Sequence, residues 1–185
     1  MSNLSRRGFI ATLGGGVALA GCGNGFGSSG ATRIDARVQA TLQQMRVEAP
    51  GSARLEEKAV GMLVMPLVTE AGFGIGGAYG RGALVVNGVT VDYYSQAKAS
   101  LGIQAGAQQY AHVLFFMTED ALADFRTGEG WVAGADLKYA VATEAGKISA
   151  DSITTLNPVV ALVFGQAGLI LGATLEGAKY TRIIP

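Results

Sequence analysis

Within residues 71–86, small residues occupy every second position from 72 to 82. They are Gly72, Gly74, Gly76, Ala78, Gly80 and Gly82. Successive side chains of a β-strand point to opposite faces, so this spacing predicts a strand with one face almost free of side chains. Another backbone or a packed element can approach such a face unusually closely. The rest of the fold has to accommodate that close approach.

Glycines at matched spacing occur twice more along the chain. Gly102 and Gly106 are four residues apart, and so are Gly168 and Gly172. Three strands with matched small faces predict one sheet that bends strongly or closes on itself. The fold class we expect is α+β, with a mainly antiparallel, strongly bent or barrel-like, glycine-rich sheet.

Turn and strand signals complete the expected sheet. Asn87-Gly88 lies between two apolar runs, and this dipeptide is the strongest short-range signal of a hairpin. A short buried strand is expected at residues 61–66, and a bend or bulge within residues 99–117. Residues 159–173 suit a pair of buried strands, and residues 180–185 suit an edge strand.

Two helices are expected. Thr118 can cap an acidic first turn, which predicts a short helix near residues 118–127. Residues 33–46 predict an N-terminal amphipathic helix, because apolar residues recur there at helical spacing. These are Ile34, Val38, Leu42 and Met45. The apolar stripe either packs on the core of the domain or lies in a membrane interface, and Asp35 weakens the second interpretation.

The first residues carry two export signals. Arg6 and Arg7 stand in a sequence that matches the twin-arginine pattern, and a short apolar run follows them. Leu19-Ala20-Gly21-Cys22 then looks like a bacterial lipobox, in which the cysteine is acylated and becomes the new N-terminus. An ordinary cleaved signal with an incidental cysteine is the alternative. We expect a signal peptide over residues 1–21 and a lipidated Cys22.

These signals imply a location and a domain organisation. Gly23 rather than Asp follows the cysteine, which by the usual sorting pattern predicts an outer-membrane lipoprotein that faces the periplasm. Residues 22–32 are rich in glycine and serine and predict a flexible tether. Residues 33–185 are then expected to form a single domain. The implied partner is the membrane that holds the acyl chains of Cys22.

Charge and composition exclude two classes of site. The chain has 14 basic and 14 acidic residues, and without Arg6 and Arg7 its net charge is −2. The sequence therefore lacks the excess of basic residues that is typical of a nucleic-acid-binding protein. With one histidine and one cysteine, a clustered His/Cys metal site is excluded, whereas a carboxylate-only site is not. We expect no cofactor and no metal.

Several motifs, in order, resemble the SYLF domain family. They are Lys58-Ala59-Val60-Gly61 with Pro66, residues 71–77, 79–84, 100–108 and 113–118, Gly134-Ala135-Asp136, and residues 168–177. The resemblance covers about residues 50–180 and implies the fold of that family. Its eukaryotic relatives are described as binding phosphoinositide membranes, and some as binding actin, whereas bacterial relatives are commonly exported lipoproteins. The helix at residues 33–46 is only modestly basic, and the expected compartment holds no actin. The resemblance therefore supports the expected fold more strongly than the function of the eukaryotic relatives.

Candidate catalytic residues have simpler structural interpretations. Residues 72–77 satisfy G-x-G-x-x-G, and Asp92 stands 20 residues beyond Gly72, but β-sequence follows where a dinucleotide site needs a helix. His112 alternates with apolar residues on one strand face, which favours a structural role. The acidic pairs Glu56-Glu57 and Glu119-Asp120 are typical of helix starts.

Two further acids, Asp136 and Glu176, lie in apolar, glycine-rich segments. If they are buried they need partners, for which Lys58, Arg81 and Lys179 are candidates. A structural pairing explains them more simply than catalysis does. We therefore expect no enzyme.

Three hypotheses for function follow. The favoured one is a membrane-anchored, non-enzymatic domain that binds lipid or the envelope surface, with anionic phospholipid at Arg33, Arg37, Arg46 and Lys58. The second is an interaction lipoprotein whose partner is another envelope protein, and the third is an enzyme with an unrecognised carboxylate site. A deep apolar cavity would favour the first, a flat exposed apolar patch the second, and paired buried acids in an open cleft the third.

Overall fold

The computed structural model describes residues 25–134, 138–141, 157–165 and 175–185. The predicted export signals, Cys22 and the first residues of the tether lie outside this part of the chain. Asp136 and the expected strand with Gly168 and Gly172 lie outside it as well. Most of the other sequence-based predictions can be compared with the structure.

Two long antiparallel strands form the centre of the fold. β1 (Gly61–Val86) and β2 (Val89–Phe116) pair with each other over nearly their whole length. Asn87 and Gly88 join them with φ angles of 51° and 77°, the positive values that a two-residue type I′ hairpin turn requires. The predicted hairpin is confirmed.

β1 is one strand where the sequence predicted two. The expected strands at residues 61–66 and 71–86 are continuous, and Pro66 lies inside β1. The pairing register shifts between Met65 and Val68, which places Pro66 at an irregularity of the ladder, where a residue without an N–H group is tolerated. A second shift gives the bulge expected within residues 99–117, because Gly72 pairs with Gly106 whereas Gly74 pairs with Gly102.

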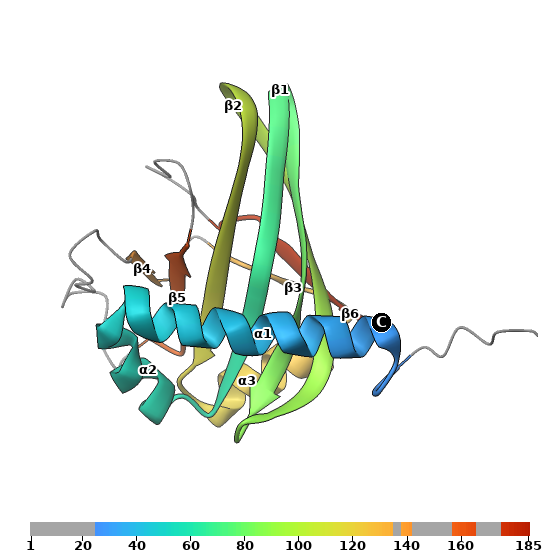
Figure 1. Cartoon of the computed structure of the whole chain (residues 1–185). Helices are drawn as coiled ribbons and strands as arrows, with labels where there is room; N and C mark the ends of the chain where they lie inside the picture. Colours follow the sequence, from blue (N-terminus) through green and yellow to red (C-terminus); the bar gives the residue numbers. More distant parts are fainter. Residues whose placement is uncertain (1–24, 135–137, 142–156, 166–174) are drawn as a thin grey trace, which may run out of the picture.

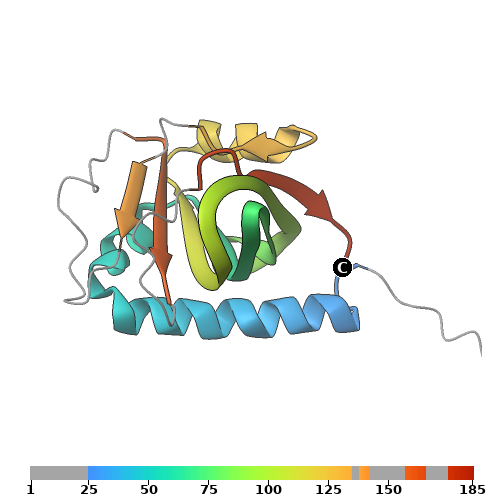
Figure 2. The same ribbon diagram turned by 90° about the horizontal axis from the view of Figure 1, so that it is seen from above.

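The glycine face packs against β1 itself. A Cβ atom at Gly82 would overlap the carbonyl oxygen of Val64, and one at Gly80 would lie 2.8 Å from the carbonyl oxygen of Leu67. β1 therefore bends back so that its two halves face each other across the small residues. Figure 1 shows the paired strands rising from the body of the molecule, and Figure 2 shows them curling when seen from above. The predicted close approach and strong bend are both confirmed.

The remaining strands pair with the two ends of β2. β6 (Lys179–Ile183) pairs with residues 93–97 of β2, and β5 (Val159–Phe164) pairs with residues 111–116. β3 (Trp131–Val132) pairs with β6, and β4 (Lys138–Val141) runs parallel to β5. β6 is not the edge strand that the sequence predicted, because it lies between β2 and β3.

Two parts of the paired strands differ in what surrounds them. The base comprises residues 93–96 and 111–116 of β2 with the β1 residues that pair with them, where β5 and β6 complete the sheet. The projecting end comprises residues 71–79 of β1 and 99–107 of β2, which stand away from the helices in Figure 1.

The helices lie at the level of the base. α1 (Ser29–Glu48) crosses it, η1 (Pro50–Ser52) and α2 (Ala53–Lys58) follow, and α3 (Glu119–Thr127) begins at the Thr118 cap, as predicted. α1 starts four residues earlier than expected, because Ser28 provides the N-cap. Residues 29–32 therefore belong to the helix and not to a flexible tether. Among the described residues, no helix is long and apolar enough to cross a membrane.

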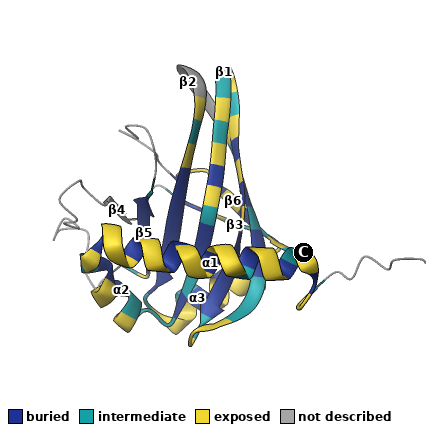
Figure 3. Ribbon diagram, viewed as in Figure 1, coloured by how far each residue is buried: buried dark blue, intermediate teal, exposed yellow. Residues whose placement is uncertain are grey.

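The apolar stripe of α1 is buried against the domain's own sheet. Ile34, Val38, Leu42 and Met45 pack in one core cluster with Phe115 and neighbouring strand residues. Figure 3 shows the exposed side of α1 turned away from the strands. The interpretation that the stripe packs on the core is confirmed, and the interpretation that it lies in a membrane interface is wrong. A second core cluster lies between the base and α3, around Tyr110, Phe116, Phe125 and Tyr180.

Candidate membrane-binding surface

The chain becomes fixed to the body immediately before α1. The backbone N–H of Gly25 donates to the carbonyl oxygen of Pro185 (2.8 Å), and the Ser28 hydroxyl donates to the same residue (2.9 Å). Ser28 also accepts from the backbone N–H of Ala31 (3.0 Å), which completes the cap. The residue expected to carry lipid, Cys22, is thus only three positions from a fixed point.

Two exposed apolar side chains lie beside this fixed point. Phe26 is 68% exposed and Ile184 is 76% exposed. A Cβ atom at Gly25 would lie 3.9 Å from Cγ2 of Ile184, and the Phe26 ring centroid lies 5.2 Å from that of Tyr93. Both side chains therefore flank the point at which the tether leaves the body.

Arg33 and Arg37 are exposed one and two turns into α1. No hydrogen bond or ion pair holds either of them within the described part of the chain. The acid between them is turned to the sheet, because Asp35 accepts hydrogen bonds from Thr90 (3.0 Å) and from the Tyr93 hydroxyl (2.9 Å). Burial, together with this carboxylate, raises the pKa of Tyr93 to about 12. Asp35 therefore docks α1 on β2 and leaves the two arginines to face solvent.

The four predicted lipid-binding residues do not form one cluster. Arg46 lies near the other end of α1, about 20 Å from Arg33 along the helix axis at 1.5 Å per residue. Its guanidinium binds Glu56 through Nε (3.0 Å) and Nη2, and this hydrogen bond raises the pKa of Arg46. Lys58 is exposed at the end of α2. Arg33 and Arg37, with Phe26 and Ile184, make up what we call the α1-start surface.

A family model described as Ysc84, Las17-binding protein actin regulator, matches residues 97–182. Residues 97–182 therefore match the SYLF domain family. The match begins within β2 and ends in β6, so it includes the second half of β2 and strands β3 to β6. No curated relative matches the chain.

Sequence reasoning missed the apolar half of the α1-start surface. Phe26 stands in a segment that was assigned to the tether, and Ile184 stands in a segment that was assigned to an edge strand. The signal that could have found Phe26 is one large aromatic residue among glycines and serines. Nothing in the sequence could place Ile184 near the start of α1, because the contact of Gly25 with Pro185 joins residues that are far apart in the chain.

The single histidine has a structural place in the core. His112 is fully buried, its Nε2 lies 2.9 Å from the Tyr180 hydroxyl, and burial lowers its pKa to about 3. A neutral, enclosed imidazole cannot reach a substrate from solvent. His112 therefore joins β2 to β6.

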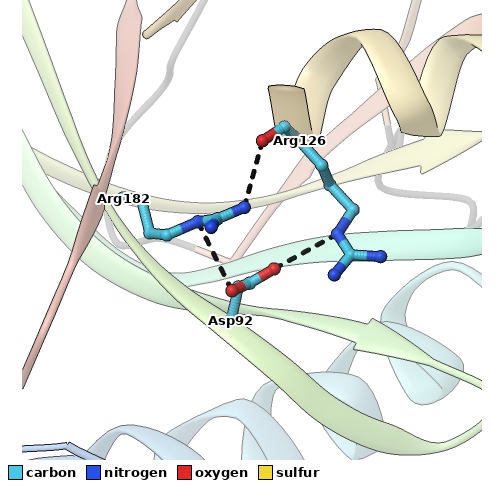
Figure 4. Close-up of polar contacts among 3 residues, drawn as sticks. All are labelled: Asp92, Arg126 and Arg182. Atoms are coloured by element: carbon cyan, nitrogen blue, oxygen red, sulfur yellow. Dashed lines mark hydrogen bonds and ion pairs between the residues drawn. The ribbon is translucent and has the colours of Figure 1, made fainter. Parts of the chain in front are cut away.

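The glycine motif and Asp92 have structural roles as well. Residues 72–77 lie within β1 and no helix follows them, so the dinucleotide motif is a false match. Asp92 instead lies between Arg126 (3.2 Å to Nε) and Arg182 (3.4 Å to Nε), as Figure 4 shows. Arg182 also donates to the backbone carbonyl of Arg126 (3.0 Å), so this cluster ties α3, β2 and β6 together.

The remaining acids do not gather into a site within the described residues. Glu56 is the partner of Arg46, Glu119 and Asp120 occupy the first turn of α3, and Glu176 is exposed. No group of three metal-ligating side chains occurs in this part of the chain. The α1-start surface is one arrangement that combines exposed basic and exposed apolar side chains.

Proposed function

We propose that this SYLF domain is a membrane-anchored, non-enzymatic lipid-binding domain of the bacterial envelope. In this proposal acyl chains on Cys22 hold it at the outer membrane, and the α1-start surface rests on anionic headgroups. The observation that carries the proposal is the short link between Cys22 and the hydrogen-bonded Gly25. Three extended residues span roughly 10 Å, so the lipid would bring the start of α1 to the membrane surface.

The chemistry of this surface suits an anionic bilayer. A basic residue near such a surface contributes about 1 kcal/mol, so Arg33 and Arg37 together would contribute about 2 kcal/mol. Phe26 and Ile184 add apolar area that can enter the headgroup region beside the acyl chains. These contributions are small on their own, and they orient a domain that its lipid already holds in place.

Actin binding is not part of the proposal. The matched family is described as an actin regulator. The export signals of this chain, Arg6-Arg7 and the lipobox at Cys22, favour a compartment that contains no actin. The proposal therefore draws on the membrane binding described for relatives of the family, and not on their actin binding.

Vesicle co-sedimentation tests the proposal. The protein used is the chain from residue 22 onward with Cys22→Ser, which retains every described residue and has no acyl chain. We expect it to bind phosphatidylglycerol vesicles at low salt and to dissociate at high salt, because exposed charges are screened over about 8 Å at physiological ionic strength. Arg33→Glu/Arg37→Glu should weaken binding at least tenfold.

The matched control is Arg54→Glu/Lys179→Glu, which changes the net charge equally at two exposed residues away from the α1-start surface. Its binding should fall much less. No binding of the parent protein at low salt would contradict the proposal. Equal losses in both double variants would show that net charge, and not this surface, controls binding.

A second candidate function has one observation in its favour. Leu67, Ile75 and Tyr79 of β1 are exposed apolar or aromatic side chains on the outside of the paired strands. A flat exposed apolar face is what an envelope protein partner would bind. Absence of vesicle binding would make this candidate the stronger one.

A further inference from the structure

The projecting end of the β1–β2 pair exposes apolar groups that nothing in the described structure covers. Ile75 is 77% exposed and Tyr79 is 51% exposed. Ala71, Ala99 and Ala107 beside them are exposed as well. Together these side chains form an exposed apolar region on a long, protruding pair of strands. Exposed apolar regions of this kind mark sites of interaction with proteins or membranes.

Charge is distributed in two levels along this end. Residues 71–79 and 99–107 contain no Asp, Glu, Lys or Arg. Lys98 pairs with Ala78 at the lower margin of this end, and Arg81 lies two residues beyond Tyr79, where its Nε donates to the Tyr79 hydroxyl (3.1 Å). The acid at the same level, Glu70, accepts from the Gln108 amide (3.0 Å). The extremity is thus uncharged, and two basic residues, Arg81 and Lys98, and one acid, Glu70, lie closer to the base.

The side-chain types along this end follow the layers of a lipid leaflet, with apolar groups at the extremity and basic groups closer to the base. Apolar side chains favour the acyl region, whereas tyrosine and arginine have apolar stems and polar tips that suit the interface. The exposed Arg81 at the lower level complements anionic phosphate. A protein partner would need no such order of levels.

We infer that the projecting end inserts into the headgroup and outer acyl region of an anionic bilayer, with Ile75 deepest and the Tyr79–Arg81 pair at the interface. Within the described residues β1 pairs only with β2, so each strand keeps an edge of backbone polar groups that hydrocarbon would not satisfy. Insertion is therefore shallow. The inference rests on the proposed function, because it names a second contact with the same bilayer.

A fluorescent probe at a single cysteine tests the inference. Cys22 is the only cysteine, so the chain from residue 22 with Cys22→Ser gives a background for Ile75→Cys, Thr69→Cys and Asp120→Cys, all at exposed positions. Each is labelled with an environment-sensitive dye and mixed with phosphatidylglycerol vesicles that carry a lipid-attached quencher. We expect strong quenching at position 75, weaker quenching at position 69 and none at position 120 on α3.

A matched pair of variants measures the contribution to binding. Ile75→Ser should weaken vesicle binding roughly tenfold, because burial of an isoleucine side chain corresponds to a factor of ten or more. Val132→Ser removes a comparably exposed β-strand residue on β3, at the base, and should leave binding unchanged. Emission from Trp131 reports whether each variant remains folded.

The outcomes separate this inference from the proposed function. Co-sedimentation with an unquenched label at position 75 would overturn the inference and leave the α1-start surface as the contact. Absence of co-sedimentation would overturn both. Equal effects of Ile75→Ser and Val132→Ser would also overturn the inference, since the loss would then not depend on the projecting end.

Discussion

The base and the projecting end belong to the same two strands, yet they differ in almost every physical property. At the base, the Phe125 ring of α3 lies 4.8 Å from Phe116 and 4.7 Å from Tyr94, between ring centroids. His112 and Gln96 are fully buried there. At the projecting end, Ile75 and Tyr79 face solvent.

The difference shows how one glycine pattern serves two purposes. Near the base, the missing side chains let β1 pack on its own backbone and place aromatic residues on the opposite layer. At the projecting end the close approach recurs, because a Cβ atom at Gly72 would lie 2.5 Å from the Cα of Gly76, but the thin pair of strands there also carries a few apolar side chains outward. Stability should therefore be sensitive to change at the base, and vesicle binding to change at the projecting end and the α1-start surface.

The largest expected effect on stability is at Gly82. A Cβ atom there would overlap the carbonyl oxygen of Val64, so Gly82→Ala forces the two halves of β1 apart. We expect a loss of about 3 kcal/mol in the free energy of unfolding, measured by urea denaturation. Gly77→Ala at the projecting end places its Cβ 3.2 Å from the Lys98 carbonyl oxygen, and its effect should stay within about 1 kcal/mol. Similar losses for both would contradict the distinction between the two regions.

Acid should destabilise the base through His112. The pKa of this imidazole is lowered to about 3 in the folded protein from 6.5, so between these values the unfolded chain binds the extra proton. Stability from this group is complete above pH 6.5 and falls as pH decreases, by about 2 kcal/mol between pH 7 and pH 5. Denaturation curves at the two pH values measure it. His112→Gln should lose that part of the pH dependence, and an unchanged dependence would show that other groups cause it.

A smaller effect is expected at the cluster in Figure 4. The Asp92 side chain is 13% exposed and binds two arginines that are 43% and 51% exposed, so solvent screens these pairs. Asp92→Asn should cost about 1 kcal/mol in the free energy of unfolding. Glu70→Gln, beside the projecting end, should cost less than about 0.5 kcal/mol. If the order of these two losses were reversed, the cluster would not be what ties α3 to the sheet.

Local sequence signals predicted local structure well. The Asn87-Gly88 turn and the Thr118 cap follow from backbone chemistry within a few residues. The spacing of the glycines predicted a close approach, but not that Val64 and Leu67 of the same strand would make it. The apolar stripe of α1 predicted a buried face, although periodicity alone could not decide between the core and a membrane.

Contacts between distant parts of the chain were not predictable. β1 is continuous through Pro66 because a register shift accommodates it, and register depends on the partner strand. Arg46 appeared as available as Arg33 in the sequence, but Glu56 of α2 binds it in the fold. The α1-start surface needed the contact of Gly25 with Pro185, which no local signal encodes.

The central claim is that the α1-start surface rests on an anionic membrane, and a label at its centre tests it most directly. Phe26→Cys in the Cys22→Ser chain places a dye at a position that is 68% exposed beside the tether. With phosphatidylglycerol vesicles that carry a lipid-attached quencher, we predict strong quenching at low salt and recovery at high salt. Protein that sediments with the vesicles while this label stays unquenched would contradict the claim.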